Sequence, residues 1–129
     1  AASADLSTPF EAAAAHGGTI VRDLLKKGLW DNGDYRLFYN VNFPPVGARD
    51  VRGVKVAAQG YRKEAFFGVE PHISPSGRKF LWIKGGPQHL PTAAGTDAHA
   101  NLEGYISVTP MRADLTAHDA LEALRTALE

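Results

Sequence analysis

The stretch Gly95–His118, GTDAHANLEGYISVTPMRADLTAH, contains the signals that decide the fold of this chain. Thr96 and Asp97 provide side-chain oxygens that can cap a short helix, which we predict over Ala98–Glu103. Gly104 suits the left-handed backbone conformation that commonly ends a helix. A cap, a helix and a stop signal therefore follow one another within a few residues.

A short strand is predicted directly after this helix, over Tyr105–Thr109, because its residues alternate between two faces. Ile106 and Val108 form the apolar face. Pro110 has no backbone N–H and is expected to end the hydrogen-bonding ladder of the strand.

The end of the chain is predicted to be an amphipathic helix, Ala117–Leu128, with Thr116 as its cap. Such a terminal helix can dock on its own domain or exchange into a neighbouring subunit. Asp114 and His118 lie one helical turn apart at its start, and we predict that they form a hinge that sets where the helix docks. A catalytic role for this pair is the less favoured alternative.

The first half of the chain is expected to begin with a long helix. The sequence Thr8-Pro-Phe-Glu11 is a capping box with proline at the first helical position, so the helix is predicted from there to about Lys27, with a stop at Gly28. Gly17-Gly18 weakens its middle, and a continuous helix is favoured over a break. Its predicted apolar spine is Phe10, Ala13, Ala14, Ile20, Val21, Leu24 and Leu25.

Two strands are predicted next, over Tyr35–Phe43 and Val51–Ala58. The first is apolar on both faces near its centre, which is typical of a sheet that is covered on both sides. Asn40 and Asn42 share one face of this strand. The favoured interpretation is that they pin the backbone or meet solvent, and the alternative is that they approach a ligand at the sheet edge where open α/β sheets bind ligands.

A long hairpin is predicted within Arg62–Lys84. Its arms, Ala65–Ile73 and Arg78–Ile83, flank the turn Ser74-Pro-Ser-Gly77. Because a two-stranded ribbon cannot hide both of its faces, we expect another subunit or domain to cover it. The predicted oligomer-interface residues of the hairpin and the terminal helix are Phe66, Phe67, Phe80, Trp82, Leu121 and Leu124.

The composition is that of an ordinary globular domain. The chain has 129 residues, of which 44% are hydrophobic and 22% charged, and its 14 basic and 14 acidic residues cancel. This balance gives no electrostatic case for nucleic acid or an anionic membrane. The absence of cysteine excludes disulfides and fits the cytoplasm. Met111 is the only methionine, which suggests an engineered fragment or the surviving part of a longer chain.

No complete catalytic motif is present. The sequence lacks a phosphate-binding P-loop, a dinucleotide-binding glycine motif, a nucleophile elbow and zinc-type histidine spacing. Asp97 with His99 is a loose acid–base or metal pair, but a capping aspartate beside an exposed histidine is favoured. Arg62 and Lys63 can meet a phosphate, although adjacent bases more often form a solvated face.

Four ordered blocks resemble the SurE family of nucleotidases, the survival-protein-E family, whose name refers to survival under stress. They are Tyr39–Pro44 (YNVNFP), Val54–Gly60 (VKVAAQG), the G-T-D of Gly95–Asp97 with the later G-Y-I-S-V-T-P-M, and D-L-T-A-H. Each block alone is a weak signal, but their order makes the resemblance specific. It covers nearly the whole chain from about Thr8 onward.

This resemblance implies a metal-dependent phosphatase that acts on nucleoside monophosphates and sometimes on short polyphosphates. In the family a divalent metal, expected to be Mg²⁺ or Mn²⁺, is held by a paired aspartate, a serine and an asparagine in the N-terminal part of the fold. No position here matches those ligands. The resemblance therefore places no catalytic and no metal-binding residue in this chain.

The expected fold class is α/β, as the C-terminal part of a SurE-like, Rossmann-type three-layer α/β/α fold. Residues 8–62 and 95–113 would complete the core of this single partial domain. Residues 63–91 would form a projecting β-hairpin with its return loop, and residues 114–129 an exchangeable C-terminal helix.

The intact enzyme is expected to remove phosphate from nucleoside 5'- or 3'-monophosphates by metal-assisted hydrolysis, as a cytoplasmic homodimer or homotetramer. This chain would complete the core and assemble the oligomer, and would be inactive alone. The alternative is a non-catalytic oligomerisation or binding module whose working parts are the hairpin and the terminal helix.

Overall fold

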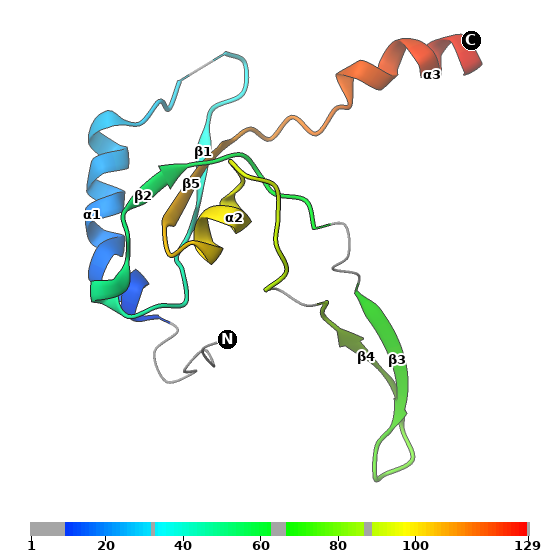
Figure 1. Cartoon of the computed structure of the whole chain (residues 1–129). Coiled ribbons are helices and arrows are strands. Elements are labelled where there is room, and N and C mark those ends of the chain that lie inside the picture. Colours follow the sequence, from blue (N-terminus) through cyan, green and yellow to red (C-terminus); the bar gives the residue numbers. More distant parts are fainter. Residues whose placement is uncertain (1–9, 32, 63–66, 87–88, 129) are drawn as a thin grey trace.

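A computed structural model describes residues 10–31, 33–62, 67–86 and 89–128 of the chain. It shows a small α/β core from which a hairpin and a C-terminal helix extend in different directions (Figure 1). The core combines the helix α1 (Glu11–Lys27), the strands β1 (Phe38–Asn42), β2 (Val54–Val56) and β5 (Ile106–Met111), and the short helix α2 (Asp97–Leu102). The predicted α/β fold class is confirmed.

The core sheet has the order β1-β5-β2, with β5 in the centre. β1 is antiparallel to β5, with Asn40 opposite Thr109 and Asn42 opposite Ser107. β2 is parallel to β5 and places Lys55 opposite Ser107. Because residues that lie opposite each other project from the same face, this register divides the sheet into two chemically distinct faces.

One face of the sheet is apolar and packs against α1. Ile106 and Val108 of β5 are buried there together with Ile20 of α1, and Tyr39, Val41 and Leu24 pack around them. The opposite face carries the polar residues of the same strands. Ser107 and Thr109 are buried on this polar face, and α2 lies over it, since the Asn101 amide Nδ2 of α2 is 3.4 Å from Ser107 Oγ. The sheet is thus a middle layer between α1 and α2.

The helix α1 differs from its prediction at the N-terminus and along its apolar stripe. It ends before Gly28 and runs without a break, as predicted, but it begins at Glu11, and the N-cap residue Phe10 makes no side-chain capping bond. The predicted capping box depends on Thr8 and Pro9, which lie outside the described residues. Glu11 Oε2 instead accepts a hydrogen bond from the backbone N–H of Ala48 at 3.4 Å.

The predicted spine of α1 is only partly buried. Ile20 is buried, but Phe10, Val21 and Leu25 are 77%, 56% and 68% exposed. Ala12, which lies outside the predicted spine, is fully buried. The apolar stripe of α1 is wider than the part of the helix that a three-stranded sheet can cover, so some of its apolar residues stay exposed.

Pro110 does not end the strand. β5 continues to Met111, and Pro110 lies opposite Tyr39 within the antiparallel ladder. Tyr105, predicted as the first strand residue, precedes β5, and α2 begins one residue earlier than predicted. Gly104 adopts a φ of 84°, the left-handed conformation expected of a helix stop.

The predicted hairpin is formed by β3 (Gly68–Ile73) and β4 (Lys79–Lys84), a separate two-stranded sheet. It projects away from the core (Figure 1). One face carries Glu70, His72, Phe80 and Trp82, with His72 and Phe80 stacked at 5.7 Å between ring centroids. Every residue of both strands is exposed.

The C-terminal segment also leaves the core. A 3-10 helix, His118–Ala120, leads into α3 (Leu121–Leu128), which has no buried residue. The predicted capping role of Thr116 is wrong: Ala117 precedes the first turn and no side-chain cap bond forms. Thr116 instead donates its backbone N–H to Asp114 Oδ1 at 2.9 Å.

Candidate functional site

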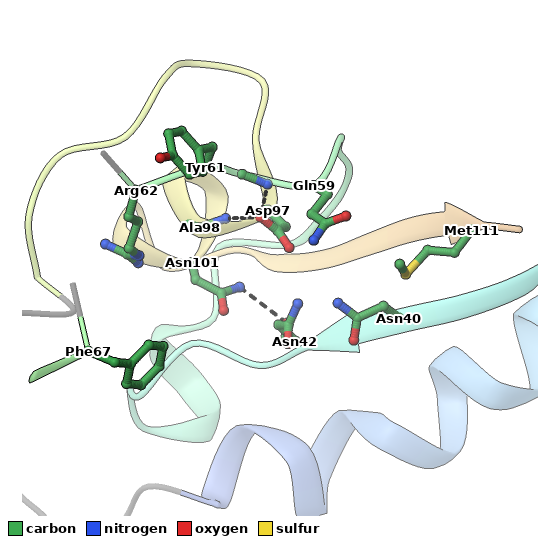
Figure 2. Close-up of a pocket in the computed structure, with 11 residues that line it drawn as sticks. Asn40, Asn42, Gln59, Tyr61, Arg62, Phe67, Asp97, Ala98, Asn101 and Met111 are labelled. Carbon is green, nitrogen blue, oxygen red and sulfur yellow. Dashed lines mark hydrogen bonds between the residues drawn. The ribbon is translucent and has the colours of Figure 1, made fainter. Parts of the chain in front are cut away.

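A cavity of about 510 Å³ opens on the polar face of the core sheet, beside α2 and the loop that follows β2 (Figure 2). Its lining is rich in side-chain amides and poor in charge. The lining residues are Asn40, Asn42, Gln59, Gly60, Tyr61, Arg62, Phe67, Asp97, Ala98, Asn101 and Met111. Its volume lies within the range of ordinary small-molecule sites, about 300–1,000 Å³.

Asn40 and Asn42 enter this cavity because of strand alternation. Tyr39 and Val41 point to the apolar face, so Asn40 and Asn42, which alternate with them, point to the polar face. Figure 2 shows both amides projecting from β1 toward α2 and the loop after β2. Both residues line the cavity, and a ligand contact there stays a prediction beside the favoured interpretation that they pin the backbone or meet solvent.

Asn101 of α2 fixes one wall of the cavity. Its Nδ2 donates to the backbone oxygens of Asn42 at 3.2 Å and Tyr105 at 2.9 Å. The bond to Asn42, which Figure 2 shows, joins α2 to the end of β1, and the bond to Tyr105 joins α2 to the residue that precedes β5. The side-chain amides of Asn40, Asn42 and Gln59 have no hydrogen-bond partner among the described residues, so their hydrogen-bonding groups are available to a ligand.

Thr96 and Asp97 hold the loop after β2 in place. Thr96 is the N-cap residue of α2, and its Oγ1 accepts from the backbone N–H of His99 at 3.3 Å. Asp97, predicted as a cap, is the first helical residue, and its Oδ1 accepts from Gly60 N at 2.8 Å and Ala98 N at 2.7 Å. A Cβ at Gly60 would lie 3.0 Å from Asp97 Oδ1, a tight contact, so glycine suits the close approach of this loop.

Arg62 is the one cationic side chain among the described residues of the cavity lining. Its Nη1 donates to the backbone oxygen of Leu90 at 3.0 Å, which ties the guanidinium to the returning chain. Tyr61 and Phe67 add aromatic surface and are 76% and 74% exposed. Lys63, the other predicted phosphate contact, lies outside the described residues.

A second cavity of about 630 Å³ adjoins the first and shares Gln59 and Met111 with it. Thr109 lines this cavity and is 4% exposed, and its Oγ1 has no hydrogen-bond partner. A buried hydroxyl without a partner is costly. This edge of the sheet therefore holds polar groups that the described residues leave unsatisfied.

His99 does not pair with Asp97 as the acid–base hypothesis required. Its Nε2 lies 3.7 Å from Glu103 Oε1, while Lys55 Nζ donates to Glu103 Oε2 at 2.7 Å. The hydrogen bond from Lys55 lowers the pKa of the Glu103 carboxyl. Lys55 also lies 3.9 Å from the centroid of the Tyr105 ring. These contacts form a structural network beside α2.

Asp114 and His118 meet before α3, away from the amide-rich cavity, and Asp114 is among the lining residues of the second cavity. His118 Nε2 donates to Asp114 Oδ2 at 2.7 Å. This bond, together with those from Thr116, lowers the pKa of the Asp114 carboxyl far below its ordinary value. The geometry is compatible with the hinge hypothesis, which remains a prediction.

Of the predicted interface residues, Phe66 lies outside the described part of the chain. The other five are surface residues: Phe67 is 74%, Phe80 42%, Trp82 58%, Leu121 43% and Leu124 57% exposed. The structure contains a single chain, so their role in an oligomer remains a prediction.

The described residues do not fit a metal centre. No cluster of three or more histidine, aspartate or glutamate side chains suited to a metal ion occurs among them. Asp97, the one carboxylate among the described lining residues of the cavity, already accepts two backbone hydrogen bonds. Within the same described ranges, no helix is long and apolar enough to cross a membrane.

Sequence alone missed Gln59 as a lining residue. The sequence feature that could have identified Gln59 is its position in the block VKVAAQG, beside a glycine at the carboxyl end of a predicted strand. In a parallel pair this is where open α/β sheets bind ligands. The assignment needed the parallel pairing of β2 with β5, which no local pattern reveals.

Several proteins of established name are similar to the chain over nearly its full length. A 5'-nucleotidase SurE from Cereibacter sphaeroides (strain ATCC 17025 / ATH 2.4.3) is 71% identical over 119 residues, which are 92% of this chain and 46% of that protein. A 5'-nucleotidase SurE from Ruegeria sp. (strain TM1040) is 60% identical over 94% of this chain and 46% of its own length. The chain spans about half the length of the curated relatives that it matches.

A solved structure shows the same fold. The SurE protein from Aquifex aeolicus aligns with a TM-score of 0.62 and 34% sequence identity, over 93% of this chain and 46% of that chain. No protein-family model matches the sequence.

Proposed function

We propose, since this chain belongs to the SurE family, that it forms the C-terminal portion of a nucleotidase that removes phosphate from nucleoside 5'- or 3'-monophosphates. The identity of 71% over 92% of the chain to a protein named 5'-nucleotidase SurE supports this activity. In this proposal the chain completes the core of the enzyme and assembles its subunits.

The open edge of the core sheet is the observation that carries the proposed role in core completion. β2 lies at the edge, and its Val54 and Val56 are 51% and 78% exposed. An apolar groove of about 390 Å³ runs between these valines and Ile20 and Leu24 of α1. Exposed apolar surface of this kind marks an interaction site. We infer that the remaining part of the enzyme continues the sheet at β2 and fills this groove.

The divalent cation of the reaction, Mg²⁺ or Mn²⁺, is proposed to be held by the remaining part of the enzyme. The described residues offer no carboxylate cluster for a hard cation, which takes several oxygen ligands. When bound, such a cation polarises a phosphoryl oxygen and activates water. No step of that chemistry is assigned to a residue of this chain.

Subunit assembly is proposed to use the hairpin and α3, in a homodimer or homotetramer. Both elements project from the core (Figure 1) and expose large apolar side chains, among them Leu81, Trp82 and Leu124. A two-stranded ribbon exposed on both faces is marginally stable in water. A second subunit that covers it would remove this exposed surface.

The activity is tested by measuring phosphate release from AMP and from 3'-AMP by the intact protein, with Mg²⁺ or Mn²⁺ and then with a chelator. We expect release that depends on the cation. No release from any nucleoside monophosphate would overturn the proposal and favour the alternative, a non-catalytic oligomerisation module built on the exposed hairpin and α3.

A further inference from the structure

The cavity that contains Asn40 and Gln59 lies where an α/β sheet binds its ligand. Gln59 follows β2, and Met111 is the last residue of β5, which is parallel to β2. Both residues line the cavity. In open α/β sheets, ligands bind outside the carboxyl ends of parallel strands. The position of the cavity alone, independently of which residues line it, therefore indicates a binding site.

The chemistry of the lining suits an uncharged ligand with hydrogen-bonding edges. Three amides with no hydrogen-bond partner among the described residues, those of Asn40, Asn42 and Gln59, project toward the same space (Figure 2). An amide offers an acceptor and two donors side by side, which matches the edge of a nucleobase. Tyr61 and Phe67 supply aromatic faces at the rim, against which a base can stack.

A phosphate group fits the same cavity poorly. Among the described lining residues the one cationic side chain is that of Arg62, and it already donates to the backbone oxygen of Leu90. The Asp97 carboxylate adds negative charge to the lining. An anion would thus meet one partly committed guanidinium and one like charge, whereas a nucleoside would meet neutral amides and aromatic rings.

We propose that this amide-lined cavity binds the nucleoside moiety of the substrate, with Asn40, Asn42 and Gln59 hydrogen-bonding to the base and Tyr61 and Phe67 lying against it. The proposal rests on the proposed nucleotidase function and adds the place where the substrate is recognised. The phosphate is then directed away from this cavity, toward the part of the enzyme that holds the cation.

Binding to this chain tests the cavity directly, by isothermal titration with adenosine, ribose 5-phosphate and inorganic phosphate. We expect adenosine to bind and neither phosphate compound to displace it. Asn40→Leu and Gln59→Met keep the size of the side chain and remove its hydrogen-bonding groups, so each should weaken adenosine binding about tenfold. Thr126→Val, a matched polar-to-apolar change in α3, should leave binding unchanged.

Absence of adenosine binding, displacement of adenosine by phosphate, or equal affinity in the wild type and both cavity variants would each overturn the proposal. Circular dichroism confirms that the variants are folded. Because the two replaced side chains make no hydrogen bonds within the described protein, neither change removes a bond that supports the fold.

Kinetics of the intact protein separate this proposal from the proposed function. AMP contains a nucleoside, whereas p-nitrophenyl phosphate contains none. In the Gln59→Met variant the ratio of KM for AMP to KM for p-nitrophenyl phosphate should rise about tenfold. If the wild type hydrolyses both esters and the ratio is unchanged, the nucleoside site is wrong. If the wild type hydrolyses neither ester, the proposed function is wrong. The binding of adenosine alone then tests whether the cavity is a nucleoside site.

Discussion

At the scale of single residues, Asn101 is a side chain that ties α2 to the core. Its amide satisfies the backbone oxygens of Asn42 and Tyr105 at 3.2 and 2.9 Å. We expect Asn101→Ala to lower the free energy of unfolding by about 1–3 kcal/mol, because acceptors in a partly buried site lose their partner. The control is Asn40→Ala, which removes no such bond. Equal shifts of the urea midpoint for the two variants would contradict this assignment.

The Asp114–His118 contact gives a prediction about pH. The hydrogen bonds from His118 and Thr116 depress the pKa of the Asp114 carboxyl below its ordinary value of 3.8. A depressed carboxyl pKa adds stability that is present above the ordinary value and is lost as the pH falls through the folded one. We therefore expect the joint before α3 to keep its arrangement at mildly acidic pH and to loosen only in strong acid.

Carbon NMR of the Asp114 carboxyl checks this directly. In His118→Ala the pKa of the Asp114 carboxyl should lie closer to its ordinary value, because the largest cause of its depression is removed. An Asp114 carboxyl that titrates normally in the wild type would show that the contact does not form in solution, and the hinge hypothesis would lose its basis.

How far single residues can be assigned from sequence depends on the range of their interactions. Thr96 and Gly104 act through their own backbone neighbours, so capping and turn rules located both. Asp97 was predicted as a cap, but it anchors Gly60, 37 residues away in sequence. Gln59 was missed as a lining residue for a similar reason, since its place in the cavity depends on strand pairing.

At the scale of elements, the hairpin carries the clearest prediction. Strand alternation places Phe80 and Trp82 on one face with His72, while Leu81 and Ile83 project from the other. If another subunit covers the hairpin, Trp82→Ala should cost about 2 kcal/mol or more of association free energy and shift the oligomer toward smaller species. Light scattering on the intact protein measures this shift.

The matched control for this prediction is Ser76→Ala, in the turn at the tip of the hairpin, which removes little surface. Leu81→Ala reports separately on the opposite face of the ribbon. If all three variants keep the wild-type mass at every concentration, the hairpin is not an assembly element.

The existence and order of the elements could be predicted from sequence, whereas their ends could not. Hydrophobic periodicity and the turn residues of Ser74–Gly77 located every α-helix and strand of the described chain, but not the 3-10 helix Ala48–Asp50. The prediction that Pro110 ends β5 failed because proline lacks only its own N–H. Its carbonyl and its neighbours remain able to pair, and the ladder continues to Met111. Boundaries of this kind are set by the partner strand and not by the local sequence.

At the scale of the whole molecule, the core sheet has an apolar face and a polar face, and the described residues also expose apolar surface to solvent. The apolar face is covered by α1, and exposed apolar surface includes the edge at β2, the hairpin and α3. Sequence indicated the last two through their unpartnered apolar residues. It did not indicate that β2 is an edge strand, because a valine-rich strand has the same sequence pattern in the centre of a sheet and at its edge.

The central claim is that this chain builds and assembles a nucleotidase without holding its metal. The most direct measurement is phosphate release from AMP with Mn²⁺ by the purified 129-residue chain, run beside the intact protein under the same conditions. We expect turnover by the intact protein and none by the chain, because its described carboxylates form no cation site. Mn²⁺-dependent turnover by the chain alone, abolished by a chelator, would contradict the account.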